Sequence, residues 1–265
     1  MIVSDISITS IETMSVFDIT TGAFKFTLDE LQSVSMSQSE ETTEITGKHG
    51  RRLGLIKRNK SVTFSGTNGM ISHGLLELQT GSEFNNTTTD ILWTDFITVG
   101  ASDGATKTAY KAVGTAGAEI LAMYIRNENG SLGTKLEQAA QAGEGTFAYA
   151  PATKTLTFDS SITAGTELVC YYMRKITADV MESHLDNLSG KGQVYIDALG
   201  EDRCGNIYRV QIYIPKASFS GDFSFDMGDN QTVHNFDIEA LAGVCLGKEQ
   251  YFTWTVFGVN AEDAA

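Results

Sequence analysis

Three acidic residues in the last fifth of the chain are the first candidates for chemistry, because clustered carboxylates bind calcium. Asp222, Asp226 and Asp229 lie close enough in sequence to share a cation. However, Asp222 and Asp226 fall within KASFSGDFSFDMG, where alternation predicts a strand, and Met227 interrupts a calcium-binding loop. We therefore expect no calcium site there.

Other groups that could do chemistry are isolated. Asp197, Glu201 and Asp202 could supply a carboxylate pair for glycoside hydrolysis, but no aromatic residues surround them, and a solvated turn is the simpler interpretation. The four histidines, His49, His73, His184 and His234, lack zinc-binding spacing. We expect His73 and His184 on helix surfaces. Nucleophile-elbow, phosphate-loop and dinucleotide motifs are absent. The sequence predicts no enzyme, no metal and no cofactor.

Composition indicates a globular, acidic protein. The 265 residues are 42% hydrophobic and carry a net charge of −14, which disfavours general binding to nucleic acid. The few prolines and many glycines suit an all-β chain. Three scattered cysteines, Cys170, Cys204 and Cys245, predict a reducing compartment without a disulfide framework. The segment MIVSDISITS lacks the features of a signal peptide, and no apolar run could span a membrane, so we expect folding in a cytosol.

A basic segment interrupts this acidic chain. It contains Lys48, His49, Arg51, Arg52, Lys57, Arg58 and Lys60, with no acidic residue between them. One interpretation is a solvated hairpin with a basic tip. The other is a contact arm, for which an acidic second copy of the chain is the most complementary partner. Nucleic acid is less favoured because no aromatic residues alternate with the cations.

Four segments, around 33–41, 59–65, 218–226 and 235–239, alternate between a hydrophobic face and a face of hydroxyl, amide and carboxylate side chains. We expect the first two to pair through the basic segment and the last two to form a second hairpin through MGDNQT. Such a face, free of cations, would let a polyanion pass without forming ion pairs, although Ser- and Thr-rich solvent faces are also common. Further strands are predicted at GQVYIDAL, NIYRVQIYI and YFTWTVFG.

Helical spacing indicates two helices. GMISHGLLELQTG predicts a helix near 70–80, capped by Asn68 and ended by Gly81. TADVMESHLDNLSG predicts another, from Thr177 to Gly190. Between them, 90–176 is predicted to be an inserted small β-domain containing the hairpin TFAYAPATKTLTF, which leaves 1–89 and 177–265 as the discontinuous main domain.

The segments KSVTFSGTNGMISHGLLELQTG and KASFSGDFSFDMGDNQTVHNFDIEAL resemble the major tail tube protein of long-tailed bacteriophages. The similarity covers about 33–84 and 190–257, and the middle insertion departs from the shortest members of that family. The resemblance implies a mainly β fold: a β-sandwich or partial barrel with a flanking helix, a long hairpin arm and an inserted Ig-like domain. The related tubes of contractile tails and injection machines share this fold.

The resemblance also implies a virion role. Six copies would form a ring, and stacked rings would form a tube, assembled in the host bacterial cytoplasm. The 40–60 arm would reach the neighbouring ring, and the insertion would decorate the exterior. The channel would hold a tape-measure protein and then pass DNA, without sequence-specific binding, and tail tip and tail terminator proteins would be further partners. The expected channel-lining residues are Ser35, Ser37, Ser39, Glu41, Ser61, Thr63, Ser218, Ser220, Asp222, Ser224, Asp226, Asn235, Asp237 and Glu239.

A second interpretation stays open from the residues alone. A carbohydrate-binding or adhesin-like β-sandwich would also explain the strands and the acidity. It should expose aromatic side chains near one loop end, and the best candidates are Trp93, Tyr171 and Tyr172.

Overall fold

The computed structural model describes residues 5–101, 105–225, 233–242 and 249–258. The chain divides into two compact units: Met1–Phe84 with Met181–Ala265, called the body here, and Asn85–Val180, called the middle unit. The limits of the middle unit lie a few residues outside the predicted 90–176 insertion. Within the described ranges, no helix is both long and apolar enough to cross a membrane.

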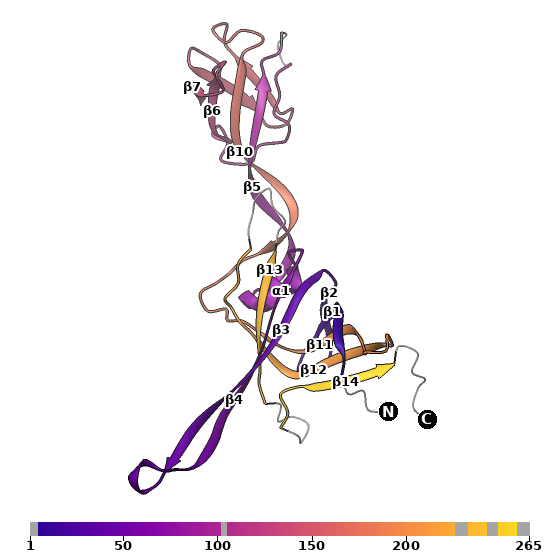
Figure 1. Cartoon of the computed structure of the whole chain (residues 1–265). Coiled ribbons are helices and arrows are strands. Elements are labelled where there is room, and N and C mark those ends of the chain that lie inside the picture. The colour runs from indigo at the N-terminus through magenta and orange to yellow at the C-terminus, as the bar shows by residue number, and fades with distance from the viewer. Residues whose placement is uncertain (1–4, 102–104, 226–232, 243–248, 259–265) are drawn as a thin grey trace. The chain divides into compact units, whose positions relative to one another are not determined.

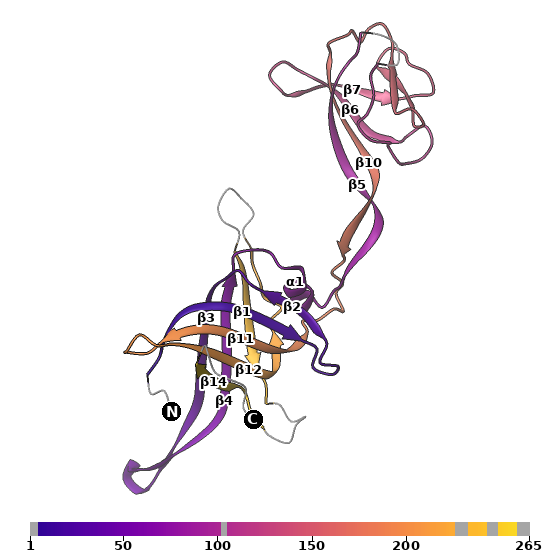
Figure 2. The ribbon, with the colours of Figure 1, turned by 90° about the vertical axis from the view of Figure 1, so that its right-hand side faces the viewer.

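One curved sheet forms most of the body. Its strands follow the order β2-β1-β11-β12-β13-β4-β3, and β14 pairs with β12 beside this path. Figure 1 shows the β3–β4 hairpin, and Figure 2 shows β1, β11 and β12 running side by side. The strands span Ser7–Phe17 (β1), Phe24–Leu28 (β2), Leu31–Thr46 (β3), Arg52–Asn68 (β4), Lys191–Glu201 (β11), Ile207–Phe219 (β12), His234–Ala240 (β13) and Thr253–Gly258 (β14). The three further strands predicted from the sequence are thus confirmed as parts of β11, β12 and β14.

The first predicted helix forms as α1, His73–Thr80, but its cap differs from the expected one. Ser72, not Asn68, is the N-cap, and its hydroxyl accepts a hydrogen bond from the Leu75 amide. Asn68 cannot serve because it is the last residue of β4 and pairs with β13. Gly81 ends the helix as predicted, in the left-handed conformation that favours glycine.

The core of the body lies between α1 and one face of the sheet. Leu75 and Leu78 of α1 pack with Phe64 of β4, Phe236 of β13 and Phe219 of β12, all nearly inaccessible to solvent. Burial of these side chains fixes the phase of the strands, because a slip of one residue would move every hydrophobic side chain to the opposite face.

The second predicted helix is wrong. Residues through Met181 belong to β10, Glu167–Met181, which pairs with β5, Phe84–Thr98. Asn86 donates a hydrogen bond to Asp179 across these strands, so a partner distant in sequence outweighs the weak helical spacing. Leu185 and Leu188, expected on one side of this helix with Met181, are 102% and 82% exposed.

The middle unit has its own sheet and its own core. The strand order is β5-β10-β6-β7-β8-β9, with β6 at Ile120–Arg126, β7 at Leu132–Gln138, β8 at Thr146–Ala150 and β9 at Thr155–Phe158. The predicted hairpin is confirmed, since β8 and β9 pair antiparallel from Phe147 to Ala150. Met123, Phe147, Leu168 and Tyr172 fill the core.

Candidate functional site

The polar face predicted from alternation forms a continuous surface on β3, β4 and β13. Pairs of hydroxyl side chains join β3 to β4 on this side of the sheet. Polar residues of β13 lie opposite those of β4 and continue the surface onto a third strand. The contacts are Ser33–Thr67 and Ser35–Ser65 at 2.8 Å and Ser39–Ser61 at 2.7 Å, and the cross-strand partners are Thr67–Asn235, Ser65–Asp237 and Thr63–Glu239. We call this surface the polar face. Ser33 and Ser65 belong to the predicted polar segments 33–41 and 59–65, and Thr67 extends the surface beyond them.

Charge on the polar face is purely acidic. Asp237 and Glu239 are exposed, and the strand segments 33–39, 61–67 and 235–239 contain no Lys or Arg. The next strand continues the row, since Ser218 of β12 lies opposite Glu239. Its other neighbour is Lys191 of β11, the first cation along this row.

The second predicted hairpin pairs at Ala217–Phe219 with β13 and again at Phe225 with His234, and its turn, MGDNQT, lies outside the described residues. β12 ends at Phe219, and Ser220, Asp222 and Ser224 lie outside a regular strand. The hydroxyl of Ser220 accepts a hydrogen bond from the Asp222 amide at 3.1 Å, a local bond that competes with strand pairing. Two of these residues still border β13: the Ser220 amide bonds the Asp237 carbonyl, and Ser224 bonds the side chain of Asn235. Asp226 and Asp229 lie outside the described residues.

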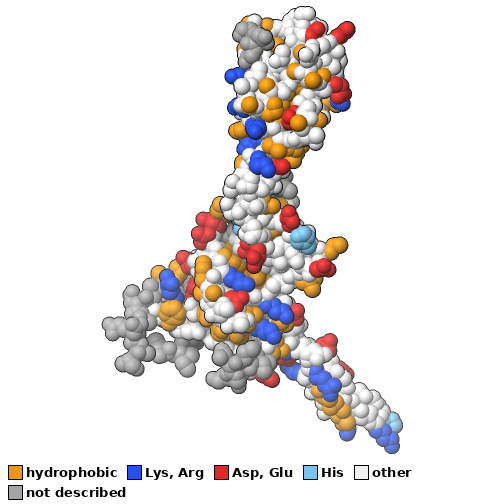
Figure 3. Space-filling model, turned by 180° about the vertical axis from the view of Figure 1, so that it is seen from behind, with side chains coloured by type: hydrophobic (Ala, Val, Ile, Leu, Met, Phe, Trp, Pro, Cys, Tyr) orange, Lys and Arg blue, Asp and Glu red, His pale blue; other side chains and the backbone are white. Residues whose placement is uncertain are grey.

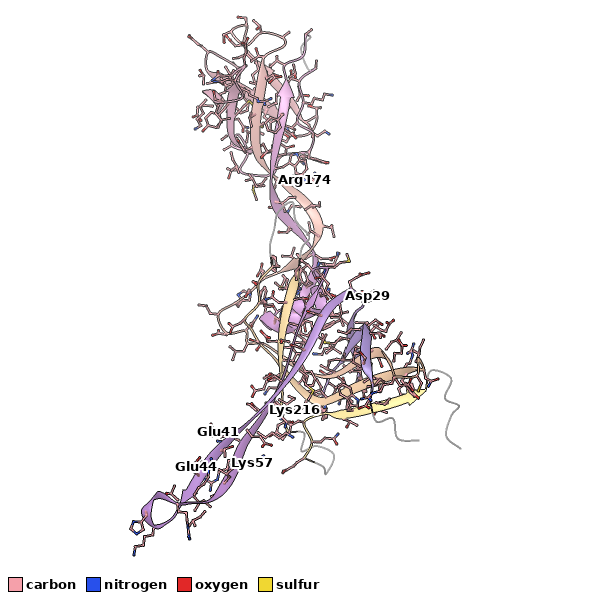
Figure 4. The ribbon with its side chains drawn as sticks, in the orientation of Figure 1. Asp29, Glu41, Glu44, Lys57, Arg174 and Lys216 are labelled. Atoms are coloured by element: carbon pink, nitrogen blue, oxygen red, sulfur yellow. The ribbon has the colours of Figure 1, made fainter. Side chains whose placement is uncertain are left out.

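The β3–β4 hairpin carries the basic segment at its end, around a short 3₁₀ turn at Lys48–Gly50. We call residues 40–60 the arm. Some of its charge is already paired within the hairpin: Lys57 lies 3.2 Å from Glu40, and Arg52 bonds Glu44. Figure 4 labels Glu41, Glu44 and Lys57 along the arm. These exposed pairs contribute little stability, but they reduce the net positive charge that the sequence led us to expect.

Hydrophobic side chains on the arm are a feature that the sequence interpretation missed. Ile45, Leu53 and Leu55 are 43%, 58% and 48% exposed. Figure 3 shows hydrophobic side chains beside cations along the arm. The alternation of leucines with other residues in RRLGLIKR indicates this apolar row, alongside the cations of the same segment.

An irregularity at Asn59 marks the base of the arm. Ser61 pairs with Ser39, whereas Arg58, not Asn59, pairs with Glu41, so β4 contains an extra residue there. Asn59 has a φ of 50° and its side-chain amide donates to Glu41 at 2.6 Å. The predicted alternation from Asn59 to Ser65 is therefore interrupted by a bulge, which bends a strand and increases its twist.

The groups considered for catalysis have structural roles. Asp202 accepts hydrogen bonds from the Asn206 side chain and the backbone of a tight turn, and these bonds lower its pKa. Asp197 accepts from Gln211 at 2.9 Å. Burial raises the pKa of the Cys170 thiol to about 12. Among the described residues, no three His, Cys, Asp or Glu side chains are grouped as metal ligands would be.

The histidines are also structural. His234 is fully buried and its Nε2 lies 2.8 Å from the Gln79 amide oxygen of α1, while burial lowers its pKa. His73 begins α1 and stacks on Phe84 at 4.2 Å. His184 lies in the loop after β10, not on a helix.

The aromatic residues proposed for sugar binding do not form an exposed platform. Tyr172 is fully buried and its hydroxyl bonds Asp95 at 2.7 Å. Trp93 is partly covered by the guanidinium of Arg174, whose central carbon lies 4.5 Å from the ring centre. This arrangement removes the main support for the carbohydrate-binding alternative.

Comparison with known proteins places the chain in a family. No curated protein is similar enough in sequence to count as a relative. The family model described as the YomU/Tube protein family matches residues 6–252, nearly the full chain, including the polar face, the arm and the middle unit. The chain therefore belongs to the YomU/Tube protein family.

Proposed function

We propose that the chain is a structural virion protein that polymerises as stacked rings into the tube of a phage tail. Membership of a tube family supports a structural role in the tail. The observation that carries the finer proposal is the polar face, which presents hydroxyl and acidic groups without Lys or Arg over three adjacent strands.

A channel surface of this kind suits the passage of DNA. Phosphates bind proteins mainly through cations, so a wall of hydroxyls and carboxylates offers them no ion pairs. The strand phase supports turning the polar face to the channel, because the opposite face of the same strands packs on α1. The tape-measure protein would occupy this channel before DNA, and tail tip and terminator proteins would close its ends.

Ring formation would use the free edge of β3. This strand lies at one end of the sheet path and pairs only with β4 among the described strands. An exposed edge of this length favours pairing with another chain. We propose that β3 of each copy joins an edge of the neighbouring copy, so that six sheets close into one barrel.

Stacking would use the arm. Leu53 and Leu55 expose apolar surface on the arm, and burying it against another ring is favourable by about 25 cal/mol per Å². Lys48 and Arg51 near the tip form no ion pair with any residue that the structure describes, and they would face the acidic body of the next ring. The 90–176 region, as an Ig-like insertion, would lie on the tube exterior.

Electron microscopy of negatively stained protein, across a concentration series with light scattering, tests the proposal. We expect wild-type protein to form rings or hollow tubes. A Leu53→Ser, Leu55→Ser variant should lose stacked tubes, whereas Leu132→Ser, which changes an exposed leucine of the middle unit, should retain them. Monodisperse monomers at every concentration, or equal assembly by the arm variant, would contradict the proposal.

A further inference from the structure

An arginine in the middle unit is held between two aromatic rings. The central guanidinium carbon of Arg174 on β10 lies 3.6 Å from the ring centre of Tyr110 and 4.5 Å from that of Trp93. The two rings meet edge to face at 5.2 Å. Cation–π contacts of this kind fix the plane and position of the guanidinium. Figure 4 labels Arg174.

The hydrogen-bonding capacity of this arginine is unused within the described residues. Its Nε and Nη1 atoms are enclosed and have no hydrogen-bond partner. Nη2 is not among the enclosed atoms and forms no hydrogen bond with a described residue, so it is the guanidinium nitrogen that a ligand could contact. Buried donors normally have hydrogen-bond partners. Here the guanidinium contacts the faces of Trp93 and Tyr110 instead, and Nη2 is the atom left for a ligand.

Among the described residues, the buried carboxylate of Asp95 forms no ion pair with Arg174. Asp95 accepts hydrogen bonds from the Trp93 indole at 2.8 Å, the Ala109 amide at 2.8 Å and the Tyr172 hydroxyl at 2.7 Å. Its oxygens are therefore occupied in holding Trp93 and the segment before Tyr110. This carboxylate therefore holds in place the two rings that contact Arg174.

Three lysines belong to the chain segments that contain or contact Tyr110. The Lys154 ammonium donates to the Ala109 carbonyl at 2.9 Å, Lys111 follows Tyr110, and Lys107 forms a bridge with Thr155. None of the three forms an ion pair with a described residue, whereas Arg126, Lys135 and Lys175 of the same unit each have an acidic partner. Figure 3 shows Lys and Arg side chains gathered on one flank of this unit.

We propose that Arg174 and these three lysines form a binding site for a phosphate-bearing polymer. Arg174 would contact one phosphate oxygen through Nη2, and Lys107, Lys111 and Lys154 would contact neighbouring phosphates. Phosphate is favoured over carboxylate because the enclosed Nε and Nη1 prevent the two-point fork that arginine offers a planar carboxylate. Lysines act as point charges that suit tetrahedral phosphate. This site is separate from the polar face and does not depend on tube assembly.

Titration of the full-length chain tests the site, with linear polyphosphate, inorganic phosphate and poly-L-glutamate as probes at equal charge concentration. Binding is followed by calorimetry and by tryptophan emission, measured in a Trp254→Phe background so that it reports Trp93, which packs on Arg174. We expect polyphosphate to bind most tightly and its affinity to fall as salt is added. Lys111→Gln should weaken binding about fivefold, the upper range for an exposed charge contact. Arg174→Lys, which keeps the charge but loses the planar guanidinium, should weaken it about tenfold.

Lys135→Gln is the matched control, because it removes one exposed cation from the same unit at an ion pair with Glu137. We expect it to bind polyphosphate as the wild type does. Equal losses for Lys111→Gln and Lys135→Gln would show a general charge effect and overturn the site. Equal affinity for poly-L-glutamate would overturn the preference for phosphate, and inorganic phosphate binding as tightly as the polymer would exclude the lysines from the site.

Discussion

Neighbouring residues of β13 provide the sharpest test of which face of the sheet is the core. Ile238 is 1% exposed and lies opposite Phe64 of β4 and Phe219 of β12. Asp237, the residue before it, is exposed on the polar face. Ile238→Ala removes three carbons, which costs about 2.4 kcal/mol in transfer free energy before any cavity is counted. With the cavity, we expect the free energy of unfolding to fall by about 2–5 kcal/mol.

The matched variant is Asp237→Asn, which keeps the side-chain shape and removes one charge. We expect it to change the free energy of unfolding by less than about 0.5 kcal/mol, as for most surface substitutions. Urea titration followed by circular dichroism measures both variants. Hydrogen exchange assigns the transition to the body through the amides of β4 and β13, with those of β6 and β10 as an internal reference.

The opposite order of effects would refute this strand phase. If Asp237→Asn lost more than about 2 kcal/mol while Ile238→Ala lost less than about 0.5 kcal/mol, the polar face would be the buried one. A register slip of one residue would produce that result, and the channel proposal would then fail.

Three further predictions concern glycine geometry, pH and charge. Gly81 and Gly22 have similar positive φ values, 68° and 69°, but an added Cβ would lie 2.1 Å from the Leu188 carbonyl oxygen at Gly81 and in open space at Gly22. Gly22→Ala should lower the free energy of unfolding by about 1–2 kcal/mol, measured by urea titration, and Gly81→Ala should lower it clearly more. Because burial lowers the pKa of His234, the unfolded state binds a proton more readily than the folded state does. The free energy of unfolding should therefore be highest above about pH 6.5 and fall as the pH drops toward the folded-state pKa of His234. His234→Gln should show a smaller fall over the same pH range. Thr63→Lys should leave the unfolding free energy within about 0.5 kcal/mol of wild type yet make assembled tubes retain DNA at low salt in a filter-binding assay.

Alternation in the sequence was sufficient for β4 and β13 because each strand has one buried face, whereas β3 was predictable as the pairing partner of β4 and has only half-buried residues, such as Val34, on its apolar side. Val62, Phe64, Phe236 and Ile238 repeat at every second position, and burial leaves no other phase. The helix α1 was also predictable from Leu75, Leu78 and the following glycine. These features depend on neighbours in sequence, which a single chain reveals.

Features set by distant partners were not predictable in the same way. The residues from Thr177 to Met181 continue as a strand because β5 pairs with β10, and the leucines with helical spacing, Leu185 and Leu188, lie in the loop that follows. The bulge at Asn59 and the irregular segment after Phe219 arise from side-chain hydrogen bonds that leave no periodic signal. The contacts of Arg174 with Trp93 and Tyr110 join residues from three separate segments, so no local sequence pattern indicates them.

Reconstruction of the assembled protein by electron cryomicroscopy tests most directly whether the polar face lines a channel. We predict rings in which Ser37, Thr63 and Asp237 face the central channel, β3 pairs with a strand of the adjacent copy, and the arm contacts the next ring. A tube with this face on its outer surface, or an assembly without a central channel, would contradict the proposed function.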